Sequence, residues 1–218
     1  MKKEKNSTLN ILITSGPTKA FIDEIRYISN YSTGRLGTLI AEEFLKKGHK
    51  VTFIYGKDSI HPKGKNLKLI EIQTINDLIN VLKKELKKRY DVIIHSMAVL
   101  DYVPSKQLET KVKSDKKFWN LKLVRTPKVI KLIKKVSPES ILVGFKLEYN
   151  LKKSKIIREA KKLIKESNAD YVVANDYRDI KRGKHIASIL SKGGVVKNNI
   201  IGKENIAKEV FHLIKEGV

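Results

Sequence analysis

The first residues that could do chemistry follow a short apolar run near the N-terminus. Leu9–Thr14 is typical of a buried strand, the turn Ser15–Thr18 comes directly after it, and residues 26–37 have the sequence RYISNYSTGRLG. Hydroxyl groups and glycines at the start of a helix leave main-chain amides free to donate to a phosphate. The pattern therefore predicts an anion site where a helix begins near Gly34.

The same stretch also has a plainer interpretation. Ser32 or Thr33 would cap the helix, and Gly34 and Gly37 would permit close packing, so the spacing alone does not separate the two alternatives. The glycines match neither the G-x-G-x-x-G dinucleotide fingerprint nor a Walker motif. Ordinary NAD-binding and P-loop sites are therefore disfavoured.

Polar residues follow three later apolar runs as well. They are the segments 96–102 (SMAVLDY), 146–148 (KLE) and 175–176 (ND). In a parallel sheet, ligands bind beyond the carboxyl ends of the strands, so we expect these segments to lie at one edge with the first turn. Asp101, in the first of these segments, is a candidate site residue.

The elements that must position these residues alternate between strands and helices. Continuous apolar runs predict the strands Leu9–Thr14, Val51–Tyr55, Leu67–Ile72, Asp91–Ser96, Trp119–Val124, Ile141–Phe145 and Asp170–Ala174. Helical spacing predicts Gly34–Lys47, a helix capped by Thr74, one capped by Thr126 with Pro127 as its first residue, Ser154–Glu166 and Ile206–Ile214. Ile186–Leu190 and Val195–Val196 are typical of an antiparallel hairpin.

Strict alternation of buried strands with amphipathic helices favours an α/β fold. We expect a doubly wound, mainly parallel Rossmann-like sheet with helices on both faces, a C-terminal antiparallel hairpin, and a single domain over residues 1–218.

The composition narrows the function. The net charge of +23, from 46 Lys and Arg against 23 Asp and Glu, suits an anionic partner, either nucleic acid or a phosphorylated small molecule. The basic residues are scattered and mostly lysine, so nucleic acid is the less favoured partner. The chain has no cysteine, no membrane-length apolar run and no zinc spacing among its five histidines. We expect a cytoplasmic protein that does not enter a membrane.

Several ordered motifs together resemble one enzyme family, phosphopantothenate–cysteine ligase in its stand-alone bacterial form. The motifs that carry the resemblance are Ile11–Thr18, Arg26–Gly34, Ala98–Tyr102, Lys111–Lys113, Thr126–Ile130, Val143–Phe145 and Val173–Asp176. They span nearly the whole chain.

The resemblance implies a two-step amide synthesis in coenzyme A biosynthesis. The carboxylate of 4′-phosphopantothenate attacks the α-phosphate of CTP and releases pyrophosphate, and the amine of L-cysteine then attacks the acyl cytidylate. Such chemistry relies on positioning and on neutralising phosphate charge, usually with Mg²⁺. The resemblance also implies a homodimer joined through the Lys111 loop and the late strands.

The resemblance assigns roles residue by residue. Asn30 would donate to the acyl carbonyl oxygen in the second step, Arg26 would bind the phosphate or carboxylate of phosphopantothenate, and Lys111 would contact the nucleotide. Asp101 would hold the ribose, a phosphate-bound Mg²⁺ or a turn of the backbone, and it is the tentative metal ligand, acting mainly through phosphates. The residues expected to bind the nucleotide are Ser15, Gly16, Ser32, Gly34, Ser96, Met97, Ala98, Asp101, Lys111, Pro127, Lys128, Val129, Ile130, Phe145, Lys162 and Lys165, with Lys161 an alternative to the last two.

The chain departs from the family pattern at three positions of the nucleotide pocket. Pro17 replaces a glycine, Lys128 an aspartate and Leu100 an alanine. Two other functions remain open: an NAD(P)-binding oxidoreductase on the same kind of sheet, and a basic nucleic-acid-binding protein. The first lacks the glycine fingerprint, and the second explains only the charge.

Overall fold

An eight-stranded sheet forms the centre of the molecule in the computed structural model, which describes residues 8–115 and 117–217. Six neighbouring strands, from β10 to β5, are parallel, and β11 and β12 continue the sheet antiparallel at one edge. The strands in spatial order are β12 (Gly194–Ile201), β11 (Ile186–Ser191), β10 (Tyr171–Asp176), β9 (Ile141–Glu148), β6 (Val92–His95), β1 (Asn10–Ser15), β4 (Lys50–Gly56) and β5 (Leu67–Ile72).

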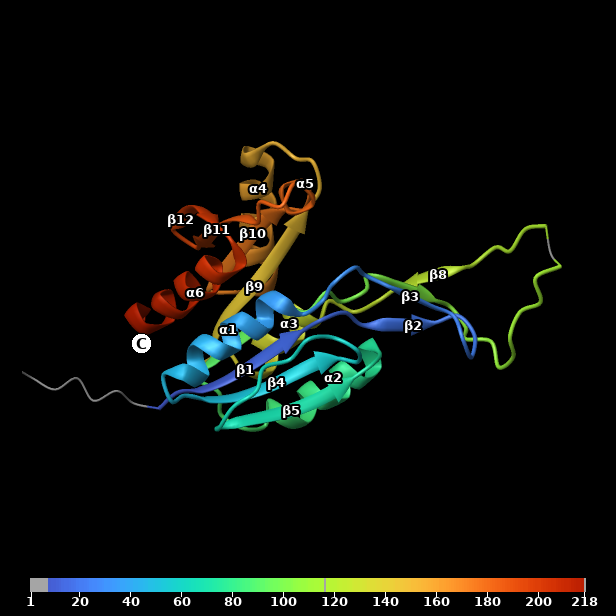
Figure 1. Ribbon diagram of the computed structural model, residues 1–218, viewed down its shortest axis with the longest axis horizontal. Coiled ribbons are helices and arrows are strands. Elements are labelled where there is room, and N and C mark those ends of the chain that lie inside the picture. The colour runs from blue at the N-terminus through green and yellow to red at the C-terminus, as the bar shows by residue number, and fades with distance from the viewer. Residues whose placement is uncertain (1–7, 116, 218) are drawn as a thin grey trace, which may run out of the picture.

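Helices cover both faces of this sheet (Figure 1). α1 (Arg35–Lys46) and α6 (Lys203–Gly217) pack on one face, and α2 (Ile75–Glu85), α3 (Val129–Val136) and α4 (Lys153–Ser167) on the other. Along β1, Ile11 and Ile13 enter the first core and Leu12 the second, which explains its unbroken apolar sequence. The expected doubly wound α/β class and the C-terminal hairpin are confirmed.

Local signals account for two of the helix ends. Thr74 and Asp77 form a capping box at the start of α2, in which each side chain accepts from the other residue's main-chain N–H. Gly48, with φ of 82°, follows α1 in the left-handed conformation that the sequence suggested for it.

Two expectations about the elements were wrong. Helices do not strictly alternate with strands, because β1 is followed by the hairpin of β2 (Lys19–Phe21) and β3 (Tyr27–Ser29), and β4 leads to β5 without a helix. The strand expected at 119–124 is instead β8 (Leu123–Arg125), which pairs with β7 (Tyr102–Pro104) outside the main sheet.

The start of α3 also differs from the prediction. Lys128 is its N-cap and Val129 its first residue, so Pro127 lies before the helix. Thr126 does not cap it, because its Oγ1 donates to the Leu100 carbonyl at 2.6 Å. This hydroxyl instead ties the loop before α3 to the segment after β6.

A long projection, which we call the arm, extends from the sheet (Figure 1). The arm consists of residues 19–29 with β2 and β3, and of residues 102–115 and 117–125 with β7 and β8. Its two parts are joined where the Leu108 N–H donates to the Ile22 carbonyl at 2.9 Å. A further short helix, α5 (Tyr177–Lys181), follows β10.

Candidate active site

The site lies where the order of the strands reverses, between β1 and β6. The chain moves from β1 outward to β4 and β5, then returns to β6 on the other side of β1 and continues to β9 and β10. At such a switch point the loops leave neighbouring strands in opposite directions, and a crevice forms at the carboxyl edge. The turn after β1 and the segment after β6 are therefore the frame of the site.

These two loops are held together by main-chain hydrogen bonds. The Ala98 N–H donates to the Gly16 carbonyl at 2.8 Å, and the Thr18 N–H donates to the Ala98 carbonyl at 3.3 Å. The Thr18 hydroxyl also accepts from the Leu100 N–H at 3.1 Å. The predicted meeting of Ser15–Thr18 with Ser96–Tyr102 is thus present in the fold.

The N-terminus of α1 closes onto the same loops. Its N-cap is Gly34, with φ of 78°, and its first turn carries no acidic side chain. The Ser15 Oγ donates to the Gly34 carbonyl at 3.0 Å, and a Cβ at Gly37 would collide with the hydroxyls of Ser15 and Ser96. Glycine at 37 thus lets the helix end approach the two serines.

The arrangement is compatible with both interpretations of Gly34 and Gly37, close packing and an anion site. Gly34 and Gly37 do serve close packing, and the positive end of the α1 dipole lies beside the loops after β1 and β6. Neither Ser32 nor Thr33 is the N-cap, although Thr33 Oγ1 accepts from the Arg35 N–H at 3.4 Å.

Asn30 follows β3 and bridges from the arm to the crevice. Its Nδ2 donates to the Val99 carbonyl at 3.2 Å and to the Ala98 carbonyl at 3.5 Å, while the residue remains exposed. The amide is therefore fixed over the segment after β6 and is still reachable by a ligand.

Below the crevice, a buried histidine supports the strand ends. His95 is 8% exposed and its Nδ1 lies 2.7 Å from Thr14 Oγ1. Desolvation lowers the pKa of His95 to about 4, so the imidazole is neutral at physiological pH. The Ser96 hydroxyl beside it donates to the Thr14 carbonyl at 2.8 Å.

Asp101 lies at the rim of the crevice and forms an ion pair with Lys128, the lysine that replaces the family's aspartate. Its Oδ1 accepts from Lys128 Nζ at 2.6 Å, and both side chains are exposed, at 59% and 44%. No group of three metal-ligating side chains occurs among the described residues. A single carboxylate still fits Mg²⁺ that is held chiefly by substrate phosphates.

Glu166 of α4 connects a lysine of α4 to a lysine of α3. Glu166 lies 3.3 Å from Lys131 Nζ and 4.0 Å from Lys162 Nζ. The hydrogen bond from Lys131 lowers the pKa of Glu166, and the charges of Lys162 and Lys128 add to this. The charges of Lys128 and Lys162 thus both act on Glu166, whereas Lys161 and Lys165 are exposed on α4.

The remaining apolar candidates are mainly packed into the fold. Met97, Val129 and Ile130 are at most 7% exposed. Phe145 is partly buried against the core beneath α1 and α6. Pro127 is exposed just before α3.

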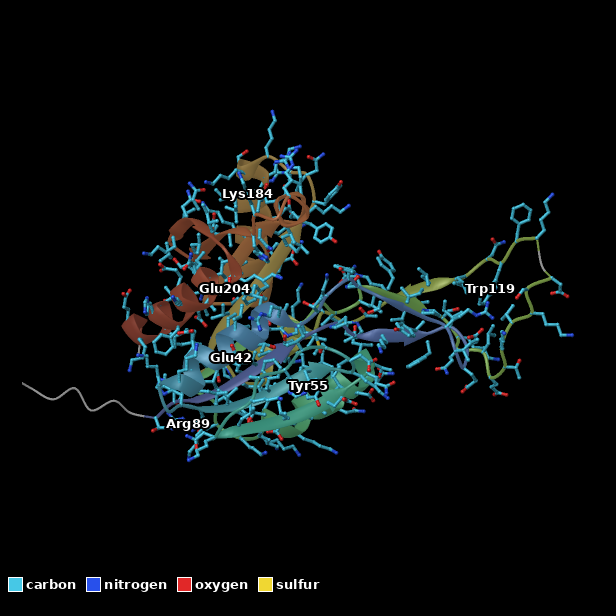
Figure 2. All side chains as sticks on the ribbon, in the orientation of Figure 1. Glu42, Tyr55, Arg89, Trp119, Lys184 and Glu204 are labelled. Atoms are coloured by element: carbon cyan, nitrogen blue, oxygen red, sulfur yellow. The ribbon has the colours of Figure 1, made fainter. Side chains whose placement is uncertain are left out.

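Arg26 and Lys111 lie on the arm and not with Asn30. Arg26 donates to Asp23 Oδ2 through Nε at 2.9 Å and to the Val112 carbonyl through Nη2 at 2.6 Å. Its guanidinium also lies 4.7 Å from the ring centroid of Trp119, which Figure 2 labels on the arm. Lys111 is exposed beside this cluster.

Two groups of polar residues were not assigned roles from the sequence. At the end of β10, Asn175 Nδ2 lies 3.1 Å from His185 Nε2, and Asp176 accepts from three main-chain amides. The second group lines a cavity beside Asn30 and includes Lys19, Lys57 and Asp58. The polar segment at 175–176 was recognisable in the sequence, but no motif marked the lysines.

The fold and the crevice define the class: a doubly wound α/β protein in which a helix begins beside the switch point of the sheet. Residues 7–218 match the family described as "DNA/pantothenate metabolism flavoprotein C-terminal domain". The chain belongs to this family, and the resemblance found in its motifs is confirmed at that level.

Relatives of known name agree with this assignment. The chain is 33% identical over 207 residues to the coenzyme A biosynthesis bifunctional protein CoaBC of Thermococcus kodakarensis, covering 94% of this chain and 51% of that protein. The CoaBC of Methanocaldococcus jannaschii is 35% identical over 176 residues, covering 81% and 42%. The chain thus spans about half the length of the curated relatives it matches.

Solved structures give the same result. The DNA/pantothenate metabolism flavoprotein from Streptococcus pneumoniae matches with a TM-score of 0.89 and 33% identity, covering 97% of this chain and all of that one (100%). The C-terminal domain of a CoaBC protein matches with a TM-score of 0.77 and 26% identity over 95% and 94%. Among the described residues, no helix has the length and apolar character needed to cross a membrane.

Proposed function

We propose that the chain is a phosphopantothenate–cysteine ligase that joins 4′-phosphopantothenate to L-cysteine through an acyl cytidylate made from CTP. The observation that carries this proposal is the meeting of Asn30, the α1 N-terminus and the loops after β1 and β6 at one crevice. Family membership supports it, because the matched relatives are named as coenzyme A biosynthesis proteins. A related protein of the same fold, Cab2, was solved with phosphopantothenate-cysteine.

In the first step, the carboxylate of phosphopantothenate attacks the α-phosphorus of CTP, a P–O bond forms, and pyrophosphate leaves. The chain contributes charge and position. The first-turn amides of α1 would bind the triphosphate, and the Ser15 and Ser96 hydroxyls would join them by releasing the carbonyls of Gly34 and Thr14. Lys128 and Lys162 are the proposed cations. No protein nucleophile is needed.

In the second step, the amine of cysteine attacks the acyl carbon. A C–N bond forms, the C–O bond to the phosphate breaks, and CMP leaves as the nitrogen gives up its proton to water. Asn30 Nδ2 has two hydrogens, so it would release its 3.5 Å contact with the Ala98 carbonyl and donate to the acyl carbonyl oxygen as negative charge develops there. The removal of one such donor typically costs about 10²- to 10³-fold in rate.

Mg²⁺ would neutralise the phosphates in the first step. Asp101 is the carboxylate placed to reach it, provided that Lys128 gives up its 2.6 Å ion pair. Lys128 would then be free to contact the phosphates itself.

A homodimer belongs to the same proposal. Arg26 and Lys111 are carried by the arm, which projects away from the sheet (Figure 1), and a second copy of the chain would bring an arm against a crevice. The β11–β12 edge is the other expected contact. Light scattering of the purified chain measures this directly, and a monomer at assay concentration would contradict it.

The decisive experiment is a pyrophosphate-release assay with phosphopantothenate, cysteine and each nucleoside triphosphate in turn. We expect release that requires phosphopantothenate and is fastest with CTP. If folded protein releases none with any triphosphate, the ligase proposal fails. The oxidoreductase and nucleic-acid alternatives have no observation in their favour beyond the sheet and the net charge.

A further inference from the structure

A cavity of about 350 Å³ lies between the β2–β3 hairpin and the loop after β4. Its volume is at the small end of the range for ligand pockets, which is about 300–1,000 Å³. The lining residues are Pro17, Lys19, Tyr27, Ser29, Asn30, Tyr31, Ser32, Lys57, Asp58 and Ser59. The cavity therefore shares Asn30 with the crevice and adds residues that no step above has used.

The cavity contains charges of both signs. Lys19 Nζ donates to Asp58 Oδ2 at 2.6 Å, with side-chain exposures of 10% and 70%, respectively. This hydrogen bond raises the pKa of Lys19 and lowers that of Asp58, so both are charged at neutral pH. Lys57 is exposed beside Asp58 and donates no side-chain hydrogen bond to any described residue.

The other polar groups leave room for a small ligand. The Ser29 hydroxyl donates to the Thr18 carbonyl at 3.0 Å, and the Ser59 hydroxyl donates to the Gly56 carbonyl. Both hydroxyls therefore hold the loops in place and are not free for a ligand. Ser32 and Tyr31 make no side-chain hydrogen bond within the described ranges. The groups available to a ligand are thus Lys57, which donates no side-chain hydrogen bond among the described residues, the second oxygen of the exposed Asp58 carboxylate, and two hydroxyls.

We propose that this cavity binds the amino-acid substrate as a zwitterion, with Lys57 on its α-carboxylate and Asp58 on its α-ammonium group. The proposal rests on the ligase function above and assigns a place to L-cysteine within it. Lys19 occupies only Oδ2 of Asp58, which leaves Oδ1 to accept from an ammonium group. A zwitterion then presents one charge to Lys57 and one to Asp58.

The position of Asn30 connects this cavity to the second step. Asn30 lines the cavity and is the residue proposed to hold the acyl carbonyl oxygen. An amino acid bound here lies next to the carbon that it must attack. Its ammonium group first gives a proton to water, and the free amine then forms the C–N bond as CMP leaves.

The test uses Lys57→Ala and Asp58→Asn in the full chain. Asp58 has φ of 69°, a conformation that asparagine tolerates, so the second variant removes charge without straining the turn. Lys63→Ala is the matched control, because Lys63 is an exposed lysine of the same loop that does not line the cavity. Melting temperatures establish that each variant is folded.

Two reactions are measured for each protein. Exchange of labelled pyrophosphate into CTP, with phosphopantothenate and no cysteine, reports the first step. Amide formation with L-cysteine, and with cysteamine, which has the amine but lacks the carboxylate, reports the second. A charged hydrogen bond of this kind is expected to change KM for cysteine by about 10- to 100-fold.

We expect Lys57→Ala to raise KM for cysteine, leave KM for cysteamine unchanged, and leave the exchange at the wild-type rate. Asp58→Asn should raise KM for both amines, and the control should change neither. Normal exchange with an unchanged cysteine KM in both variants overturns the cavity assignment alone, as does an increase confined to KM for phosphopantothenate or CTP. Absence of exchange in the wild-type protein overturns the ligase proposal and, with it, this one.

Discussion

Asn30 is the residue that links the two halves of the proposed reaction. Its amide is held on the carbonyls of Ala98 and Val99, yet it faces both the crevice and the cavity. Replacing Asn30 by aspartate keeps the shape but substitutes a carboxylate oxygen for the donor. The carboxylate would repel both the main-chain carbonyls and the developing oxyanion.

We therefore predict that Asn30→Asp allows the first step and slows the second by about 10²- to 10³-fold. The acyl cytidylate should accumulate, and its amount is measured after rapid quenching in the presence of cysteine. Asn30→Ala is the control for the charge, since it removes the donor without adding a repulsive group. Wild-type turnover in Asn30→Asp would refute the role of this residue.

At the same scale, sequence reasoning found the residues that motifs mark and missed those that only the fold brings together. Ser15, Gly34 and Asn30 stand in recognisable stretches. Ser15 contacts Gly34, and Asn30 contacts the loop after β6. Lys19 and Asp58 are separated by 39 positions and belong to a hairpin and a loop, so no spacing rule pairs them. Their ion pair arises from the way in which the arm leaves the sheet.

At the scale of elements, the strands that were predicted correctly are those with a buried run of apolar residues. β1, β4, β6 and β10 have long buried runs, which fixed their place in a parallel sheet. The strands of the arm have three residues each, and only β2 is mostly buried, so none is long enough to show an alternation. β8 was therefore misplaced, since its neighbour β7 is near only in space.

The arm itself is tied together by one buried carboxylate. Asp23 is 0% exposed and accepts from the main-chain amides of Ile25, Arg26 and Val112 and from the Arg26 side chain. Desolvation raises the pKa of Asp23, but these hydrogen bonds outweigh it and lower the pKa to about 2. The carboxylate therefore connects the two parts of the arm at all ordinary pH values.

We predict that Asp23→Asn loosens the arm and leaves the sheet intact. Limited trypsin digestion should cut faster at Lys111 and Lys113, while the melting temperature of the main transition changes little. Glu24→Gln, an exposed neighbour, is the control for charge. If the variant is cleaved at the wild-type rate, Asp23 does not hold the arm.

A second buried carboxylate joins α2 to the sheet. Glu85 is 6% exposed and accepts from Lys68 of β5, from Lys88 and from the Tyr90 hydroxyl. Burial raises the pKa of Glu85, but the three donors lower it to about 2, below its ordinary value of 4.5. Its stabilising effect is thus complete above the ordinary pKa and is lost as the pH falls towards the folded one.

Glu85→Gln should therefore destabilise the protein by about 1–3 kcal/mol at neutral pH. The difference from wild type should shrink between about pH 4.5 and pH 2. Urea unfolding at several pH values measures it, with Glu139→Gln, an exposed glutamate, as the control. A difference that is constant with pH would show that the loss comes from packing and not from charge.

At the scale of the whole molecule, the net charge of +23 was the plainest property of the sequence and the least specific. The fold concentrates part of this positive charge in one place, because Lys128, Lys131 and Lys162 lie around Glu166. Long-range attraction of this kind accelerates the encounter with anions and is screened by salt. The three proposed substrates differ in net charge, so the effect of salt on kcat/KM can be compared between them.

Raising the ionic strength from about 0.1 M to about 1 M shortens the Debye length from about 10 Å to about 3 Å. We predict that kcat/KM for CTP and for phosphopantothenate falls over this range, whereas kcat/KM for cysteine, a zwitterion of zero net charge, falls much less. Each is measured with the other two substrates saturating, and cysteamine, a cation, should show no fall. An equal loss for every substrate would point to a general effect of salt on the fold, and the charge of the surface would then have no part in the choice of ligand.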